Sequence, residues 1–201
     1  NDILIGGSGD DNLQGGAGND DLADYSSATL AVTVDLSSGG ASGQGSDILS
    51  GIENVLGGAG NDIIVSDSLD NDLDGAGGVN TISYIAAASA VNVNLRTDTA
   101  TGGGGTDSLL NFNNIVGSNF NDTFIGISGN NVIDGGFGND DLIDYSTSGS
   151  AINANLNSGI ISGDGTDFIA NIENIIGTSG NDLFVSNLAS NRIDGGSGGN
   201  D

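Results

Sequence analysis

A nonapeptide of the form GGxGxDxUx, in which U is a large aliphatic residue, recurs along this chain and constrains its fold more than any other feature. It reads GGAGNDDLA at residues 15–23, GGAGNDIIV at 57–65 and GGFGNDDLI at 135–143. A repeat of this length is one supersecondary unit that cannot bury its apolar face alone. The sequence therefore predicts a stack of short coils with one continuous core.

The nonapeptides belong to a larger unit that repeats every 60 residues. We expect one continuous solenoid, 1–201, divided into a partial module, three full modules and the start of another: 1–14, 15–74, 75–134, 135–194 and 195–201. Asp47, Asp107 and Asp167 keep the 60-residue spacing. Module 2 is the divergent copy, because it lacks one residue before Tyr84 and regains it before Asp107.

Composition favours a thin, repeated core in place of a conventional one. The chain has 37 glycines, no proline, no tryptophan and six phenylalanines. Apolar and polar residues alternate at 32–36, 91–95 and 152–156, as in half-buried strands. The fold class is all-β, with about three coils per module and a rod on the order of 50 Å long at about 4.8 Å per coil. Each 33-residue stretch between nonapeptide groups is expected to form an 18-residue coil, a nine-residue turn and strand, and a short link.

The net charge limits the classes of partner and site. The chain carries a formal net charge of -25, with two arginines, no histidine and no cysteine. Nucleic acid is excluded as a partner, because phosphate binding requires clustered Lys and Arg. Stacked carboxylates repel by about 3 kcal/mol per neighbouring pair at an effective dielectric of 20. Cations between the turns would convert this repulsion into cross-linking, so we expect a chain that unfolds without them.

Oxygen donors without His or Cys select Ca²⁺, and several ions are expected as cofactors. The sixth position of the nonapeptide and its partial copy GxGxDxU predict the carboxylate ligands Asp2, Asp11, Asp20, Asp47, Asp62, Asp107, Asp122, Asp140, Asp167 and Asp182. Backbone carbonyls are predicted ligands at Gly15, Gly57 and Gly135. Neutral amides make weaker candidates at Asn71, Asn80, Asn131, Asn191 and Asn200.

The in-phase GGxGxDxUx motif resembles the hemolysin-type calcium-binding repeats of the RTX family over nearly the whole chain. The resemblance implies a right-handed parallel β-roll, with calcium between turns two repeats apart on one side, and type I secretion. It pairs Asp2 with Asp20 and Asp122 with Asp140. The pairs Asp62–Asn80 and Asp182–Asn200 depart from the Asp pattern, and their sites are expected to be weak or empty.

Two other sets of residues receive a structural interpretation. Tyr25, Tyr84 and Tyr145 occupy nearly equivalent module positions and are predicted to form a packing layer. Glu53 and Glu173 are predicted to face solvent, with capping of a backbone amide or joining a metal site from its flank as the alternatives.

The expected function is a non-enzymatic, calcium-dependent structural module of a secreted or cell-surface protein, such as an adhesin stalk, a surface-layer subunit or a filament subunit. The alternative is the RTX secretion and folding domain of a secreted protease, lipase or polysaccharide-modifying enzyme whose catalytic domain lies outside this chain. Ice binding is disfavoured because no threonine ladder lines the turns. Sugar binding stays open through a row formed by Asp35, Asn94 and Asn155. The chain starts and stops within repeats, so we expect neighbouring repeats or head-to-tail self-association, and no membrane insertion.

Overall fold

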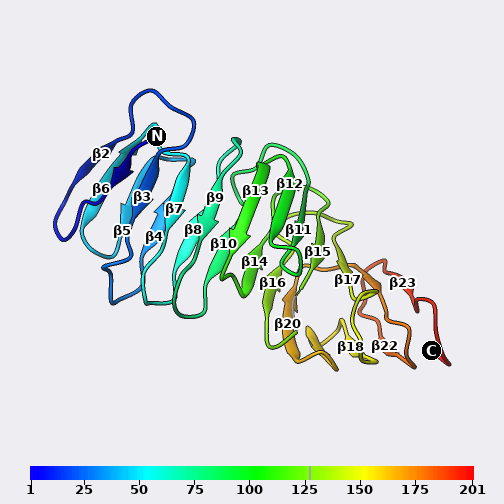
Figure 1. The fold of residues 1–201 in the computed structure, drawn as a ribbon. Helices are drawn as coiled ribbons and strands as arrows, with labels where there is room; N and C mark the ends of the chain where they lie inside the picture. The colour runs from blue at the N-terminus through cyan, green and yellow to red at the C-terminus, as the bar shows by residue number, and fades with distance from the viewer. Residues whose placement is uncertain (127) are drawn as a thin grey trace.

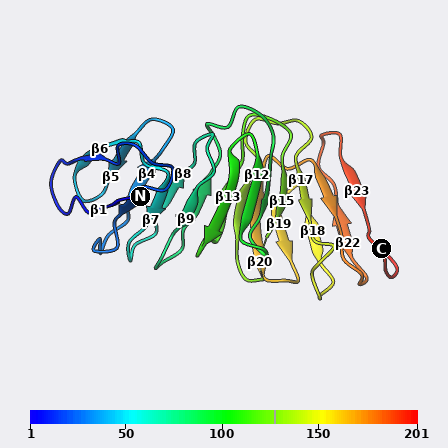
Figure 2. The ribbon, with the colours of Figure 1, turned by 45° about the horizontal axis from the view of Figure 1, so that its top comes forward.

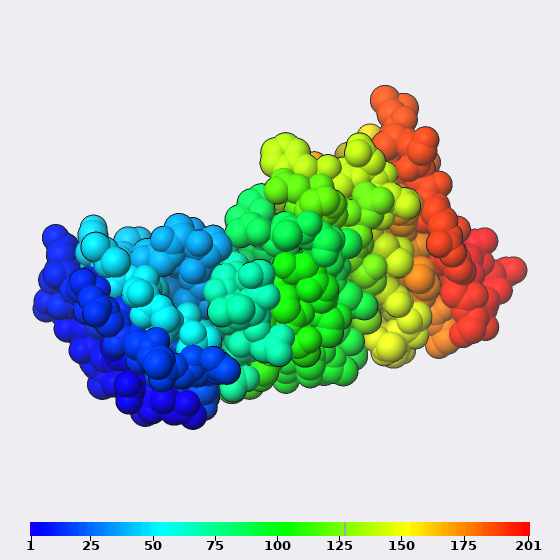
Figure 3. Space-filling model, turned by 90° about the horizontal axis from the view of Figure 1, so that it is seen from above, coloured from blue at the N-terminus to red at the C-terminus, as the bar shows by residue number. Residues whose placement is uncertain are grey.

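The computed structural model describes residues 1–126 and 128–201 as an elongated stack of short β-strands, with the two termini at opposite ends (Figure 1). These residues form no helix, and so the described part of the chain contains no helix that could span a membrane. The strands lie side by side along the stack when it is turned (Figure 2), and the space-filling view has the same elongated outline (Figure 3). The chain is thus the all-β solenoid of the β-roll kind that the repeats predict.

Two sheets make up the stack. Sheet 1 has 11 strands, in the spatial order β1 (Ile3–Leu4), β3 (Leu22–Asp24), β7 (Asn54–Leu56), β9 (Asp72–Asp74), β13 (Gly105–Leu110), β12 (Thr99–Gly102), β11 (Val91–Asn94), β15 (Thr123–Ile125), β17 (Leu142–Asp144), β21 (Asn174–Ile176) and β23 (Arg192–Asp194). Sheet 2 has 12 strands, in the order β2 (Asn12–Gln14), β6 (Ser46–Ser50), β5 (Gly40–Ser42), β4 (Thr33–Asp35), β8 (Ile63–Val65), β10 (Thr81–Ser83), β14 (Asn114–Val116), β16 (Val132–Asp134), β20 (Thr166–Ala170), β19 (Ile160–Ser162), β18 (Asn153–Asn155) and β22 (Leu183–Val185).

Most neighbouring strands are parallel, but each 33-residue stretch adds an antiparallel meander. In the first stretch β4 pairs with β5 and β5 with β6, both antiparallel, before the chain crosses to β7. The predicted division into an 18-residue coil, a turn unit and a link is therefore wrong. Residues at the hairpin turns explain the difference, because Gly39 and Gly159 adopt positive φ and let the chain reverse within one sheet.

The modules do not all place their meander in the same sheet. From β2 to β9, its counterpart 60 residues later, the chain crosses between the sheets five times. Because this number is odd, equivalent strands of successive modules lie in opposite sheets. The meanders β4–β6 and β18–β20 accordingly belong to sheet 2, and β11–β13 belongs to sheet 1.

The core is a single line of aliphatic and aromatic side chains between the sheets. Each three-residue strand from β2 to β21 buries its central residue, and Val34, Ile64, Ile82, Phe124 and Ile143 are all 0% exposed. The tyrosines also lie in this core, with Tyr25 and Tyr84 each 1% exposed and Tyr145 5% exposed. The predicted packing layer is confirmed.

Candidate metal centre

Polar side chains enter the core in a regular position, two residues before the buried centre of a strand. Asp62 precedes Ile64 in this way, and Asp141 precedes Ile143; both carboxylates are buried. The backbone amide of one such residue donates to the side chain of its counterpart in the next coil. Asp62 N donates to Asn80 Oδ1 at 2.8 Å, and Asp141 N donates to Glu173 Oε2 at 3.1 Å. These bonds tie successive coils together at the edges of the sheets.

Three of the predicted ligands hold backbone amides with both carboxylate oxygens. Asp62 Oδ1 accepts from Val32 N at 2.8 Å, and Oδ2 accepts from Gly58 N at 2.7 Å. Asp122 and Asp182 repeat the arrangement, with an added hydroxyl donor from Ser118 or Thr178. Buried carboxylates with this number of donors stabilise turns without any cation.

Asp47, Asp107 and Asp167 each pair with a core tyrosine. Tyr84 Oη donates to Asp107 Oδ2 at 2.7 Å, and Ser66 Oγ donates to the same oxygen at 2.9 Å. Burial raises the pKa of Asp107 to about 6, partly offset by these two hydroxyl donors. The pKa of Tyr84 is raised, first by burial and then by the negative charge of Asp107.

Glu53 and Glu173 do not face solvent as predicted. Glu53 is only 8% exposed, and its Oε2 accepts from Asp21 N at 3.1 Å. Glu173 Oε2 accepts in the same way from Asp141 N. The alternative of backbone capping is therefore the correct one, because each glutamate occupies the inward position two residues before a buried strand centre.

Two of the fully buried aspartates have a carboxylate oxygen with no hydrogen-bond partner among the described residues. Asp21 and Asp141 are both 0% exposed, and in each case Oδ2 is the unpartnered atom. Each Oδ2 lies within its own glycine-rich turn, where a Cβ on Gly18 or Gly138 would meet it. The Oδ1 atoms are used, since they accept the backbone amides of Asp2 and Asp122 at 2.6 and 2.7 Å.

A divalent cation fits these turns. A Cβ on Gly15 would overlap the carbonyl oxygen of Gly51 and meet the Asp21 carboxyl group. A Cβ on Gly135 would overlap the carbonyl oxygen of Asn171 and meet Asp141 Oδ2, so a main-chain oxygen lies near each of the two carboxylates. A free carboxylate oxygen beside carbonyl oxygens is the hard donor set that Ca²⁺ takes. No three His, Cys, Asp or Glu side chains converge anywhere in 1–126 and 128–201, so the carbonyls are needed to complete such a site.

The electrostatics of the Asp141 turn also favour a cation. The pKa of Asp141 is raised to about 6, mainly by burial and also by the negative charges of Asp122, Glu173 and Asp140, against the lowering effect of the backbone amide of Asp122. An ionised carboxylate is therefore disfavoured there unless a positive charge accompanies it.

The sixth-position residues Asp20 and Asp140 lie outside these turns on the exposed surface. Asp20 accepts from the amide groups of Asn54 and Asn1, each at 2.8 Å, and Asp140 Oδ1 accepts from Asn174 Nδ2 at 2.6 Å. The coils predicted to pair do lie together. The inward residue is Asp21 beside Asp2 and Asp141 beside Asp122, one residue later than the motif indicates.

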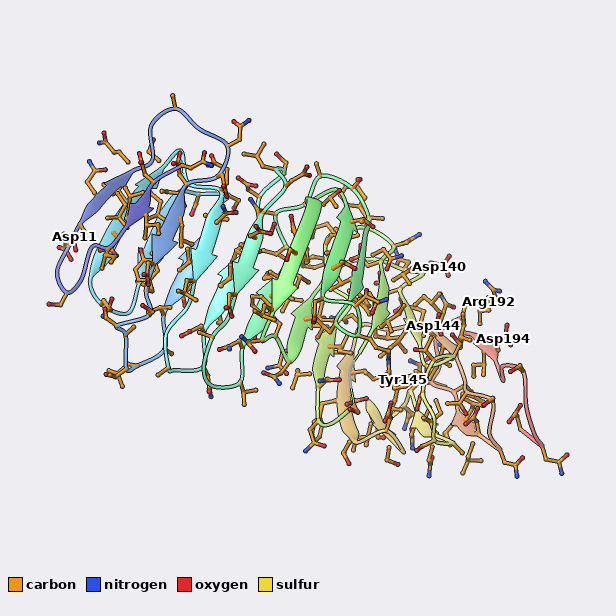
Figure 4. The ribbon with its side chains drawn as sticks, in the orientation of Figure 1. Asp11, Asp140, Asp144, Tyr145, Arg192 and Asp194 are labelled. Atoms are coloured by element: carbon orange, nitrogen blue, oxygen red, sulfur yellow. The ribbon has the colours of Figure 1, made fainter. Side chains whose placement is uncertain are left out.

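The remaining predicted ligands lie elsewhere on the edges of the stack. Asp11 is half-buried with an unpartnered Oδ2, and Asp2 is exposed. Asn71, Asn131 and Asn191 use their amide groups as donors to the carbonyls of the preceding coil at 2.8, 2.8 and 3.0 Å. Gly57 is buried beneath Asp62 Oδ2 and Gly75 O, and Asn200 is exposed. Figure 4 shows Asp11 near the N-terminal end of the stack and Asp140 in its C-terminal half.

Sequence reasoning missed Asp21 and Asp141 because it counted from the glycines. The nonapeptides at 15–23 and 135–143 have an extra residue before the buried strand centre, which is Ala23 or Ile143. Counting back two residues from that centre would have found both carboxylates.

The side chains of the row proposed for sugar binding accept hydrogen bonds within their own turns. Asp35 Oδ1 accepts from Ser37 Oγ and Ser38 N, at 2.6 and 3.0 Å, and Asn94 Oδ1 accepts from the amides of Arg96 and Thr97. These side chains cap the first hairpin of each meander.

In the comparison with known proteins, one family model matches parts of the chain. The model of the RTX calcium-binding nonapeptide repeat matches residues 1–23 and 112–142, in four copies. A search of curated proteins gave no match.

Proposed function

Because the chain carries the RTX calcium-binding nonapeptide repeat, we propose that it is a calcium-dependent structural rod with cations held in the turns of Asp21 and Asp141. The observation that carries the proposal is the pair of unpartnered, fully buried Oδ2 atoms in two turns 120 residues apart. A buried carboxylate oxygen without a donor destabilises a fold by about 1 to 3 kcal/mol or more. Calcium binding removes this penalty and makes folding depend on the ion.

The chemistry of the residues supports a scaffold. Their carboxylates recur in phase, and most of the buried ones accept backbone amides, which leaves them unsuited to acid–base catalysis. We place any catalytic activity of the parent protein in another domain. Calcium in the millimolar range is found outside cells, so a secreted or cell-surface location follows from the proposal, with roles such as an adhesin stalk or a surface-layer or filament subunit.

Calcium titration followed by far-ultraviolet circular dichroism tests the dependence of folding on the ion. We expect a change from disorder to β structure at about 10⁻⁴ to 10⁻³ M calcium, the range of extracellular modules. A β spectrum that persists in excess chelator would contradict the proposal.

Equilibrium dialysis of folded, calcium-saturated protein tests the position of the sites. Asp141→Asn should lower the number of ions bound per chain by one. Asp140→Asn, the adjacent exposed carboxylate, is the matched control and should leave the number unchanged. Equal losses in the two variants would remove Asp141 from the site.

Stacking of the rod on a second copy or on neighbouring repeats is a separate proposal. Light scattering at millimolar calcium over a range of protein concentrations tests it, and a mass that stays at one chain throughout would reject self-association.

A further inference from the structure

Four of the five buried side-chain atoms that have no hydrogen-bond partner among the described residues lie in two of the four stretches that match in the 60-residue register, which are 6–21, 66–80, 126–141 and 186–201. The fifth, Gln44 Oε1, lies outside these stretches. Asp11 Oδ2 and Asp21 Oδ2 lie in the first stretch, and Asn131 Oδ1 and Asp141 Oδ2 lie 120 residues later. In both stretches the atoms lie over glycines, since a Cβ on Gly6 would meet Asp11 Oδ2 and a Cβ on Gly126 would meet Asn131 Oδ1, both at 2.9 Å.

The stretch midway between them has no such atom among its described residues. Asn71 is the counterpart of Asp11 and Asn131, and its Oδ1 accepts from Ser66 Oγ at 2.9 Å. Serine replaces the glycine found at positions 6 and 126, and its hydroxyl supplies the missing donor.

Asn80 is the counterpart of Asp21 and Asp141. Its amide nitrogen has hydrogen-bond partners, whereas Oδ2 of each aspartate has none among the described residues. Its Nδ2 donates to the carbonyl oxygens of Gly75, Gly77 and Asn111, at 2.8, 3.1 and 3.0 Å. Gly75 matches Gly15 and Gly135 in the 60-residue register, and Asn111 matches Gly51 and Asn171. The amide group therefore occupies the place where the other two turns bring a free carboxylate oxygen close to the same carbonyls.

The family comparison separates the stretches in the same way. The matched residues, 1–23 and 112–142, include Asp11, Asp21, Asn131 and Asp141, and they omit residues 66–80. The turn of Asn80 is also one residue shorter than that of Asp141. Counting both ends, it has six residues, 75–80, whereas the turn of Asp141 has seven, 135–141.

We infer that the Asn80 amide replaces the calcium ion in the middle of the rod, so that the turn at residues 75–80 is closed without metal while the turns of Asp21 and Asp141 bind it. This inference rests on the proposed function. A polarised NH₂ group presents positive charge to the carbonyl cluster, as a cation does, but carries no net charge and needs no carboxylate to balance it. The rod then combines metal-dependent turns on either side of a metal-independent centre.

Counting bound calcium per folded chain by equilibrium dialysis tests the inference. Asn80→Asp removes three donor contacts and restores the carboxylate of the flanking turns, so it should bind one more ion than the parent chain and require more calcium to fold. Asn80→Ala is the control, because it removes the amide without adding a ligand; it should destabilise the chain and leave the count unchanged. An unchanged count in folded Asn80→Asp would overturn the inference.

A second comparison applies even where Asn80→Asp does not fold. Asp141→Asn and Asp141→Ala should both bind one ion fewer, but the asparagine can donate to the turn carbonyls as Asn80 does. Asp141→Asn should therefore fold at a calcium concentration several-fold lower than Asp141→Ala. Equal folding midpoints in these two variants would overturn the inference while leaving the calcium sites intact, whereas an unchanged count in both would overturn the proposed function itself.

Discussion

The hydroxyl of Tyr25 donates to Asp47 Oδ2 at 3.0 Å, and it is the one donor to that oxygen found in the described part of the chain. The equivalent oxygen of Asp107 accepts from both Tyr84 and Ser66. The repeat therefore contains the same buried pair with two different degrees of hydrogen bonding.

This difference predicts unequal effects of removing the two hydroxyls. Tyr25→Phe leaves a buried carboxylate oxygen without a donor and should lower the free energy of unfolding by about 2 to 3 kcal/mol. Tyr84→Phe leaves the Ser66 contact in place and should lower it by about 1 kcal/mol. Chemical denaturation at saturating calcium measures both, and a larger loss for Tyr84→Phe would contradict the assignment of donors.

Protonation of Asp107 should stabilise the fold. Its pKa is raised to about 6 in the folded chain from the ordinary value of 3.8, so the folded state binds the proton more tightly than the unfolded state. The resulting stability is fully present below pH 3.8 and is lost as the pH rises through about 6.

The variant Asp107→Asn isolates this contribution, because Asn does not titrate. As the pH falls from 7.5 to 5 at saturating calcium, the unfolding temperature of the parent chain should rise relative to that of the variant. A constant difference between the two over this range would show that Asp107 does not titrate there.

The buried carboxylate of Asp62 should matter regardless of calcium. Asp62→Ala leaves the amides of Val32 and Gly58 without acceptors and should lower the free energy of unfolding by about 2 to 5 kcal/mol. Asp72→Ala is the control, since Asp72 is exposed and no donor to its carboxylate is found among the described residues. The loss should be the same at two calcium concentrations that both fold the chains, and a loss that grows with calcium would identify Asp62 as a metal ligand.

Ala76 offers a stabilising substitution. It has a φ of 55°, in the left-handed region, whereas Gly16 and Gly136 occupy the matching turns with φ of 84° and 89°. A side chain there strains the backbone by about 1 kcal/mol. Glycine relieves this strain but also gives the unfolded chain more conformational freedom, which offsets part of the gain. Ala76→Gly should therefore raise the free energy of unfolding by about 0.5 kcal/mol, measured by denaturation at fixed calcium.

Periodicity in the sequence predicts the solenoid well, because each coil has the same aliphatic centre and glycine turn. The meanders were harder to predict, since the strands at 40–42 and 160–162 alternate in the same way as a parallel coil would. Their direction depends on hairpin turns such as the one at Gly39, which are local and follow no nonapeptide.

The sequence predicted that carboxylates lie in the glycine-rich turns, but it placed the inward carboxylate one residue too early. A count from the glycines gives Asp140, whereas burial of Ile143 in the core determines which carboxylate turns inward, and that residue is Asp141. Module 2 was expected to hold a weaker site at Asn80 on the basis of charge alone. Two of the three contacts of its amide lie within its own turn, but the third is with the carbonyl of Asn111, 31 residues away, which no local pattern reveals.

The odd number of crossings in each module determines how the rod meets its surroundings. A surface feature encoded once every 60 residues appears on one side of the rod, then on the opposite side, and returns to the first side only after 120 residues. Molecules bound to equivalent positions of adjacent modules would point in opposite directions and would not crowd one another. A rod built this way can display the same feature to two partners at once, one along each broad face.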